Sequence, residues 1–106
     1  MTVKRVQYFV TENGVSPFEN WFNKLDDVTQ AIVVRNIQRF AQGGAKKSIR
    51  ALRDGIFEIK IPYGPGYRVY FTKLEKDLIL LLIGGDKKSQ NRDIAKAKKH
   101  WRNYGK

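Results

Sequence analysis

The sequence predicts a small α+β domain in which helices flank a mostly antiparallel sheet, in the order β-α-α-β-β-β-α. Its 106 residues fit a single domain with one core. The stretch FEIKIPYGPGYRVYF, residues 57–71, alternates apolar and polar residues on both sides of a Pro/Gly-rich turn, which is typical of a β-hairpin. Segments before and after it carry apolar residues three and four apart, which predicts helices. No repeat or linker divides residues 1–106, so we expect one domain.

The first strand and the first helix have clear sequence signals. Residues 3–10, VKRVQYFV, are rich in β-branched and aromatic residues and predict a strand. Ser16, Pro17 and Glu19 then form a typical helix start, with an N-cap, a proline at the first helical position and a capping box. The predicted core face of this helix consists of Phe18, Trp21, Phe22 and Leu25.

A second helix is predicted from a start at Asp27 and Gln30 to an end at Gly43-Gly44. Its predicted core face consists of Val33, Ile37, Phe40 and Ala41. Arg35 and Arg39 lie together on a different stripe, which is either an ordinary solvated face or a stripe that faces nucleic acid. Residues 45–55 then form a basic connector that we expect to include a turn of helix.

The hydrophobic pattern of the hairpin fixes which residues share a face. With residues 62–66 as the loop, Lys60 lies opposite Arg68. The core face then consists of Phe57, Ile59, Ile61, Tyr67, Val69 and Phe71. The face away from the core consists of Glu58, Lys60, Arg68 and Tyr70.

A lysine opposite an arginine is unfavourable by up to about 1 kcal/mol, so something should offset the repulsion. A phosphate bound between Lys60 and Arg68 would do so, and a local ion pair with the diagonal Glu58 is the alternative. Lysine, arginine and a carboxylate also supply the charge stabilisation and the bases that phosphodiester cleavage needs. Tyr70 on the same face would be a surface for stacking an unpaired base.

The last third of the chain predicts a buried strand and a basic helix. The run DLILLLIGG, residues 77–85, is typical of a central strand covered on both faces. Next to it, Lys87 and Lys88 lie near the start of a helix that Ser89 can cap, which is either a solvated turn or a phosphate site. The helix runs from about Ser89 to Tyr104.

One side of this last helix is apolar and the rest is basic. Its predicted core positions are Ile94, Ala97, Trp101 and Tyr104. Its basic residues, either solvated or in contact with RNA, are Lys96, Lys98, Lys99 and Arg102.

Composition narrows the chemistry. Lys and Arg number 21 against 10 Asp and Glu, for a net charge of +11, which favours a polyanionic partner and nucleic acid first. The absence of cysteine and the single histidine, His100, exclude thiolate chemistry and the common zinc sites, so we expect no metal and no cofactor. The first residues show no signal or lipidation motif, and the longest apolar run is too short for a bilayer. We therefore expect a cytoplasmic protein without a membrane partner.

Three segments in this order, LRDGIFEIKI, YGPGYRVYF and LLLIGGDKKSQ, resemble the RelE/ParE toxin superfamily, and specifically its HigB-like addiction module killer branch. The resemblance extends along nearly the whole chain. It implies a RelE-like, microbial-RNase-like fold and ribosome-dependent cleavage of messenger RNA. Lys60, Arg68 and Lys87 match positions that act at the scissile phosphate in this family, and Glu58 stands where some relatives carry a basic residue.

The resemblance also implies a mechanism and partners. The ribose 2′-OH would attack the adjacent phosphate, with Lys60 or Glu58 as the base, Arg68 neutralising the phosphorane oxygens and Lys87 assisting the leaving oxygen. The implied partners are messenger RNA, the ribosome and a helix-turn-helix antitoxin encoded beside the toxin, through which operator DNA would be contacted indirectly. Two alternatives stay open: a ParE-like, non-enzymatic inhibitor of DNA gyrase, and a non-catalytic RNA-binding module.

Overall fold

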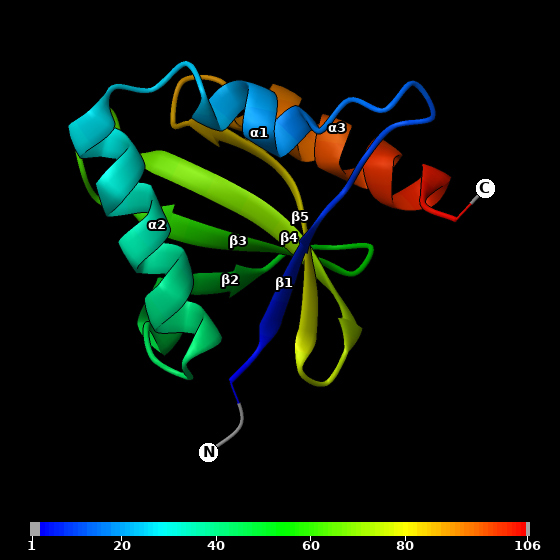
Figure 1. Ribbon diagram of the computed structural model, residues 1–106, viewed down its shortest axis with the longest axis horizontal. Helices are drawn as coiled ribbons and strands as arrows, with labels where there is room; N and C mark the ends of the chain where they lie inside the picture. The colour runs from blue at the N-terminus through cyan, green and yellow to red at the C-terminus, as the bar shows by residue number, and fades with distance from the viewer. Residues whose placement is uncertain (1–2, 106) are drawn as a thin grey trace.

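The computed structural model describes residues 3–105, within which a five-stranded sheet is packed against three α-helices (Figure 1). The elements are β1 Arg5–Tyr8, α1 Pro17–Phe22, α2 Asp27–Ala41, the 3₁₀ turn η1 Lys46–Ser48, β2 Ile49–Ala51, β3 Ile56–Ile61, β4 Tyr67–Glu75, β5 Leu78–Asp86 and α3 Gln90–Asn103. The strand order is β1-β5-β4-β3-β2, in which only the β1–β5 pair is parallel. The predicted α+β class, with a mostly antiparallel sheet flanked by helices, is confirmed.

One strand was not predicted. Where the sequence suggested a helical turn, the chain forms η1 and then the edge strand β2, which pairs antiparallel with β3. A strand of three residues is too short for its alternation to stand out from a basic connector. The observed order therefore contains one more strand than predicted, β-α-α-β-β-β-β-α.

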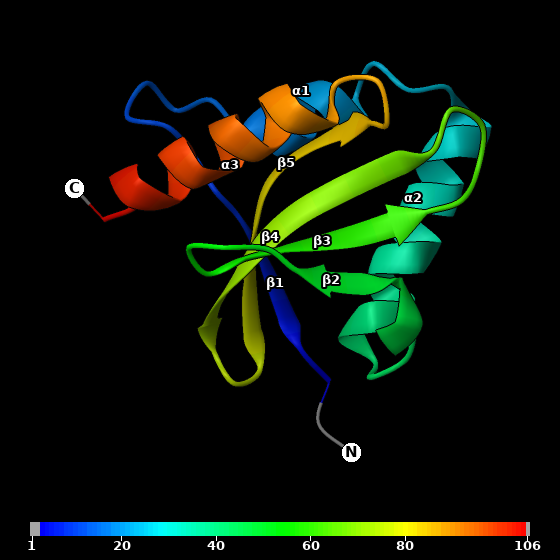
Figure 2. The same ribbon diagram turned by 180° about the vertical axis from the view of Figure 1, so that it is seen from behind.

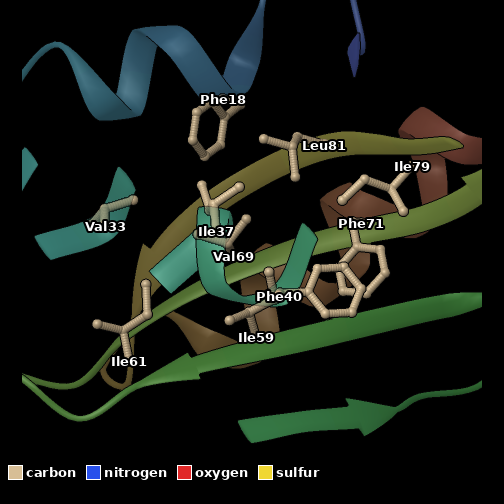
Figure 3. Close-up of a cluster of buried hydrophobic side chains, with 10 residues drawn as sticks. All are labelled: Phe18, Val33, Ile37, Phe40, Ile59, Ile61, Val69, Phe71, Ile79 and Leu81. Carbon is tan, nitrogen blue, oxygen red and sulfur yellow. The ribbon is translucent and has the colours of Figure 1, made fainter. Parts of the chain in front are cut away.

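Two helices cover one face of the sheet and build the main core. Phe18 of α1 and three residues of α2 pack there against β3, β4 and β5. Figure 3 shows this cluster, which comprises Phe18, Val33, Ile37, Phe40, Ile59, Ile61, Val69, Phe71, Ile79 and Leu81. The hairpin residues predicted to face the core all belong to it or pack against it, so the predicted parity of β3 and β4 is confirmed.

The third helix covers the opposite face of the sheet (Figure 2). Ala97 of α3 is fully buried there, next to Tyr70, Leu80 and Leu82. The strand β5 is consequently buried on both faces, as predicted. The hairpin face with Glu58, Arg68 and Tyr70 was predicted to point away from the core. This prediction was wrong for these three residues, which are buried on the face that α3 covers. Tyr104, predicted to face the core, is exposed because the helix ends at Asn103.

The helix starts follow the sequence signals with two corrections. Ser16 Oγ accepts a hydrogen bond from the Glu19 N–H at 3.2 Å, as predicted for a cap. The cap of α2 is Asp26 rather than Asp27: its carboxylate accepts from the Thr29 N–H at 2.7 Å, and this bond lowers the pKa of Asp26. Ser89 precedes α3, but its hydroxyl bonds to acidic side chains instead of capping the helix.

The glycine pair at the end of β5 lets two helices approach one strand. A Cβ on Gly84 would overlap the indole ring of Trp21 on α1, and a Cβ on Gly85 would overlap the Asp93 carboxylate on α3. Because successive residues of a strand face opposite sides, the pair removes side chains on both faces at once. This close approach sets the position of the turn at residues 87–89, which leads into α3.

None of the helices within residues 3–105 combines the length and the apolar character that crossing a membrane requires.

Candidate functional site

A groove opens on the α3 side of the sheet, between β2, the β3–β4 hairpin and the first turns of α3. The hairpin register places Lys60 opposite Arg68 and Glu58 opposite Tyr70, as predicted. The groove is lined by Lys47, Ser48, Ile49, Arg50, Glu58, Lys60, Arg68, Gln90, Asn91 and Ile94. It therefore unites three predicted catalytic residues with polar groups from η1, β2 and α3.

Arg68 is the buried cation of the groove, with only 6% of its surface exposed. Its Nη1 donates to the Gly66 carbonyl at 2.9 Å. Its Nε lies 3.7 Å from Glu58 Oε2 and makes no hydrogen bond within the described chain. The Nε atom has almost no exposed surface and lies beside Glu58, so its unused N–H adds a cost to burying the guanidinium.

Glu58 lies at the floor of the groove and contacts polar side chains from three elements. It is 3% exposed, and the Gln90 side-chain amide donates to its Oε2 at 2.8 Å. The Arg50 Nη2 lies 3.5 Å from its other oxygen, Oε1. Together with the Arg68 contact, these groups engage both carboxylate oxygens, so the local ion pair that the sequence suggested as an alternative is present.

This arrangement changes the interpretation of Glu58. Both carboxylate oxygens already have partners and the side chain is almost fully buried, so a substrate hydroxyl has little access to it. Its contacts instead fix the side chains of Arg68 and Arg50. Glu58 is thus placed to orient Arg50 and Arg68. Of the two predicted bases, Lys60 is the one that a substrate can reach.

Lys60 is exposed at the rim of the groove, and no carboxylate of the described residues forms an ion pair with it. Lys87 approaches the Arg68 guanidinium from the turn after β5. The space that a Cβ on Gly66 would fill lies 3.4 Å from Arg68 Nη1 and 3.7 Å from the Lys87 Cβ. The three basic residues predicted to act on one phosphate therefore surround the same end of the hairpin.

Lys88 lies in a neighbouring hollow at the start of α3, whose other lining residues are Asp86, Lys87, Ser89, Gln90, Asn91 and Arg92. This hollow adjoins the groove, because Gln90 and Asn91 line both.

Tyr70 is not available as a stacking surface. Its side chain is fully buried under α3, and its hydroxyl makes no hydrogen bond within the described residues. Burial, followed by the nearby charge of Glu58, raises the pKa of Tyr70 well above its usual value. The prediction that Tyr70 contacts RNA was wrong because α3 occupies the face on which a base would stack.

The other predicted RNA-binding residues lie outside the groove. Lys98 forms an ion pair with Asp54, with Nζ 3.5 Å from Oδ2. Exposed positions along the rest of α3 are held by Lys96, Lys99 and Arg102. Arg35 and Arg39 are exposed on α2, which packs against the opposite face of the sheet. These two arginines cannot contact the same short stretch of ligand as Arg68.

Sequence reasoning missed Arg50, Gln90 and Asn91. Arg50 would have been found if residues 49–51 had been recognised as a strand, because the register then places it opposite Glu58. Gln90 and Asn91 belong to the first turn of α3, whose seat on the sheet follows from tertiary packing.

Comparison with known proteins identifies the family of this chain. The family described as Phage derived protein Gp49-like (DUF891) matches residues 20–102. The chain belongs to this Gp49-like family. An uncharacterized protein of Haemophilus influenzae is 42% identical over 82 residues, which is 76% of this chain and 82% of that protein. The Gp49-like match spans the two strands of the hairpin and every residue that lines the groove.

Proposed function

We propose that this Gp49-like protein is a RelE/HigB-like toxin that cleaves messenger RNA on the ribosome and thereby inhibits translation. The observation that carries the proposal is the buried Arg68, which Glu58 orients and which lines the groove beside the exposed Lys60. Such a preorganised cation is what stabilises charge that develops on a transferring phosphoryl group. The resemblance of the hairpin and of the GGDK turn to RelE-like toxins supports the same chemistry.

The proposed reaction is an internal transfer that conserves all atoms of the RNA. The 2′-oxygen bonds to the adjacent phosphorus while the bond to the 5′-oxygen of the next nucleotide breaks, which yields a 2′,3′-cyclic phosphate and a free 5′-OH. Lys60 is the base that takes the 2′-OH proton, and Lys87 is the acid that donates a proton to the leaving 5′-oxygen. Arg68 neutralises the non-bridging oxygens, on which negative charge accumulates.

A protein partner belongs to the same proposal. A chain of net charge +11 that cuts messenger RNA must be held inactive in the cell that makes it. We propose a small antitoxin with a helix-turn-helix, encoded beside the toxin and able to link it to operator DNA. Its co-expression should restore growth and the two proteins should co-purify. The partner proposal fails if no adjacent small reading frame does either.

The decisive experiment compares induced wild-type protein with Arg68→Ala in bacteria while new RNA 5′ ends are mapped. Wild type should create 5′-OH ends within coding regions and Arg68→Ala should not. Arg53→Ala serves as the matched control, because Arg53 is an exposed arginine of the β2–β3 turn that does not line the groove. Growth arrest with broken DNA or altered plasmid supercoiling, but intact transcripts, would instead support a gyrase inhibitor. Salt-sensitive RNA binding without cleavage would support a non-catalytic RNA-binding module.

A further inference from the structure

A second hollow lies on the opposite side of the sheet, between the C-terminal end of α2, η1 and the edge strand β2. We call it the back pocket and define it by Lys4, Lys46, Lys73, Phe40, Phe57 and Ile49. It shares Ile49 with the groove but none of the charged residues of the groove. It is therefore a separate feature of the molecule.

The back pocket combines an apolar floor with a rim of ammonium groups. Lys4 Nζ lies 5.5 Å from the centre of the Phe40 ring, and Lys73 Nζ lies 4.7 Å from the centre of the Phe57 ring. Both rings pack on Phe71, at centroid distances of 4.8 and 5.3 Å. These cation–π contacts hold two lysines in place beside the pocket, at an exposed-site strength of about 0.5–1 kcal/mol each.

No carboxylate balances this rim. No acidic residue lines the back pocket, and within residues 3–105 none of its three lysines takes part in an ion pair. Three cations without a counter-charge, two of them held against aromatic rings, favour an anionic partner. The hydrocarbon floor favours an apolar group on that same partner.

The neighbouring strand offers a further means of binding a protein segment. β2 is the last strand of the sheet, so its outer edge is unpaired among the described residues. Ile49 and Ala51 line the back pocket, whereas Arg50 between them faces the groove. An extended segment beside β2 would place alternate side chains over the back pocket.

We infer that the back pocket binds an acidic segment of a partner protein, with one apolar side chain on the floor and carboxylates against the lysine rim. Charge complementarity favours an acidic partner segment, and the covered aromatic rings disfavour RNA as the ligand. A base needs a free aromatic face on which to stack. The Lys73 ammonium group lies over the Phe57 ring, and Phe40 is buried. This surface suits the protein partner proposed above, but it does not depend on nuclease activity.

Because the back pocket and the groove lie on opposite faces of the sheet, the partner segment and RNA bind at the same time.

The test is an NMR titration of ¹⁵N-labelled protein with two probes of equal charge. One probe is a capped nonapeptide with leucine at its centre and glutamate at the other eight positions, and the other is a uridine oligonucleotide with eight phosphates. We expect the peptide to shift the amide signals of Ile49, Ala51 and Phe57, and the oligonucleotide to shift those of Lys60 and Gln90. Both sets of shifts should appear together when both probes are present. Displacement of one probe by the other, or peptide shifts confined to the groove, overturns the inference.

Variants separate a built pocket from general attraction to a basic protein. Lys46→Glu combined with Lys73→Glu should lower the affinity for the peptide at least about tenfold, or about 1.4 kcal/mol. The matched control, Lys24→Glu with Lys76→Glu, changes the net charge equally at exposed lysines outside the back pocket and should have a smaller effect. Each variant should keep the dispersed wild-type spectrum, since all four side chains are on the surface.

Replacing the leucine of the peptide by glycine should also weaken binding to wild type. The inference is refuted if both double variants lose peptide affinity equally, or if the leucine has no effect on binding. It is also refuted if the Lys46→Glu, Lys73→Glu variant loses as much affinity for the oligonucleotide as for the peptide. If the oligonucleotide fails to bind at all while the peptide still maps to the back pocket, the RNA proposal fails and the pocket stands.

Discussion

Arg68→Ala should cost both stability and catalysis, and the burial of the pair explains why. Removing one partner of a buried ion pair typically costs about 3–5 kcal/mol, because the remaining charge is left uncompensated. Glu58 would keep its contacts with Arg50 and Gln90, so we expect a smaller loss of about 2 kcal/mol. For a domain of this size that lowers Tm by about 10 °C. An exposed Arg68, as strand alternation alone predicted, would have left Tm nearly unchanged.

The effect on cleavage should be larger than the effect on stability. Loss of one preorganised donor to a developing oxyanion typically slows the chemical step by about 10²–10³-fold, or about 2.7–4 kcal/mol. The assay is single-turnover cleavage of messenger RNA on programmed ribosomes, at a temperature well below the Tm of the variant. Urea denaturation of the same preparations measures the loss of stability.

Glu58→Gln distinguishes a catalytic Arg68 from one that only pairs with Glu58. The amide keeps the size of the side chain but removes the charge, so Arg68 becomes a buried cation without a counter-ion and stability should fall by a similar amount. Arg68 remains free to meet a phosphate, so this variant should bind RNA more tightly and cleave within about tenfold of wild type, less than the loss of a general acid–base group. If both variants lose stability and both still cleave like wild type, Arg68 has a structural role only.

Three further predictions concern α3 and its surroundings. Gly85→Ala should destabilise by about 1–3 kcal/mol because the new Cβ overlaps the Asp93 carboxylate; an unchanged urea midpoint would show that the contact can relax. Lys96→Gln with Lys99→Gln should flatten the slope of log K against log salt for single-stranded RNA by about 1.4, whereas a lower maximal cleavage rate would contradict a pure binding role. Burial, helped by Lys99 and Lys96, lowers the pKa of His100, so the folded state binds fewer protons than the unfolded state. Its contribution to stability is present above about pH 6.5 and is lost as the pH falls below that value. His100→Phe should keep the stack on Phe9 and flatten the stability curve from pH 7 to 5, and parallel curves would exclude His100 as the cause.

The sequence predicted the main hairpin well because its signals are local. Alternation over five residues in each strand fixes its parity, and the length of the turn fixes the register, so Lys60 opposite Arg68 followed directly. The same reasoning failed at β2, where three residues carry too little pattern. It also failed to predict what covers the second face, because alternation states which residues share a face and says nothing about the element that packs on it.

The site was predictable to the extent that strand pairing creates it. Glu58, Lys60 and Arg68 meet across one hairpin, whereas Gln90 is 32 positions away from Glu58 and reaches it only through the seat of α3 on the sheet. That seat depends on Ala97 being small and on the missing side chain at Gly85. The polar residues Glu58 and Arg68 were predicted to face solvent, but their contacts with each other allow both to be buried at a tolerable cost.

Burial of Arg68 is better explained by function than by stability. A buried ion pair contributes little net stability compared with apolar residues of the same volume, and an unused guanidinium N–H adds a further cost. For a group that must meet a phosphate as charge develops, however, burial fixes the side chain before the substrate arrives and lowers the local dielectric. The helix α3 provides both effects, because it covers the hairpin face and supplies Gln90 to hold Glu58. The helix that excludes solvent from Tyr70 therefore also prepares Arg68 for the phosphate contact we propose, and the two roles predict that mutations loosening α3 will reduce cleavage before they unfold the domain.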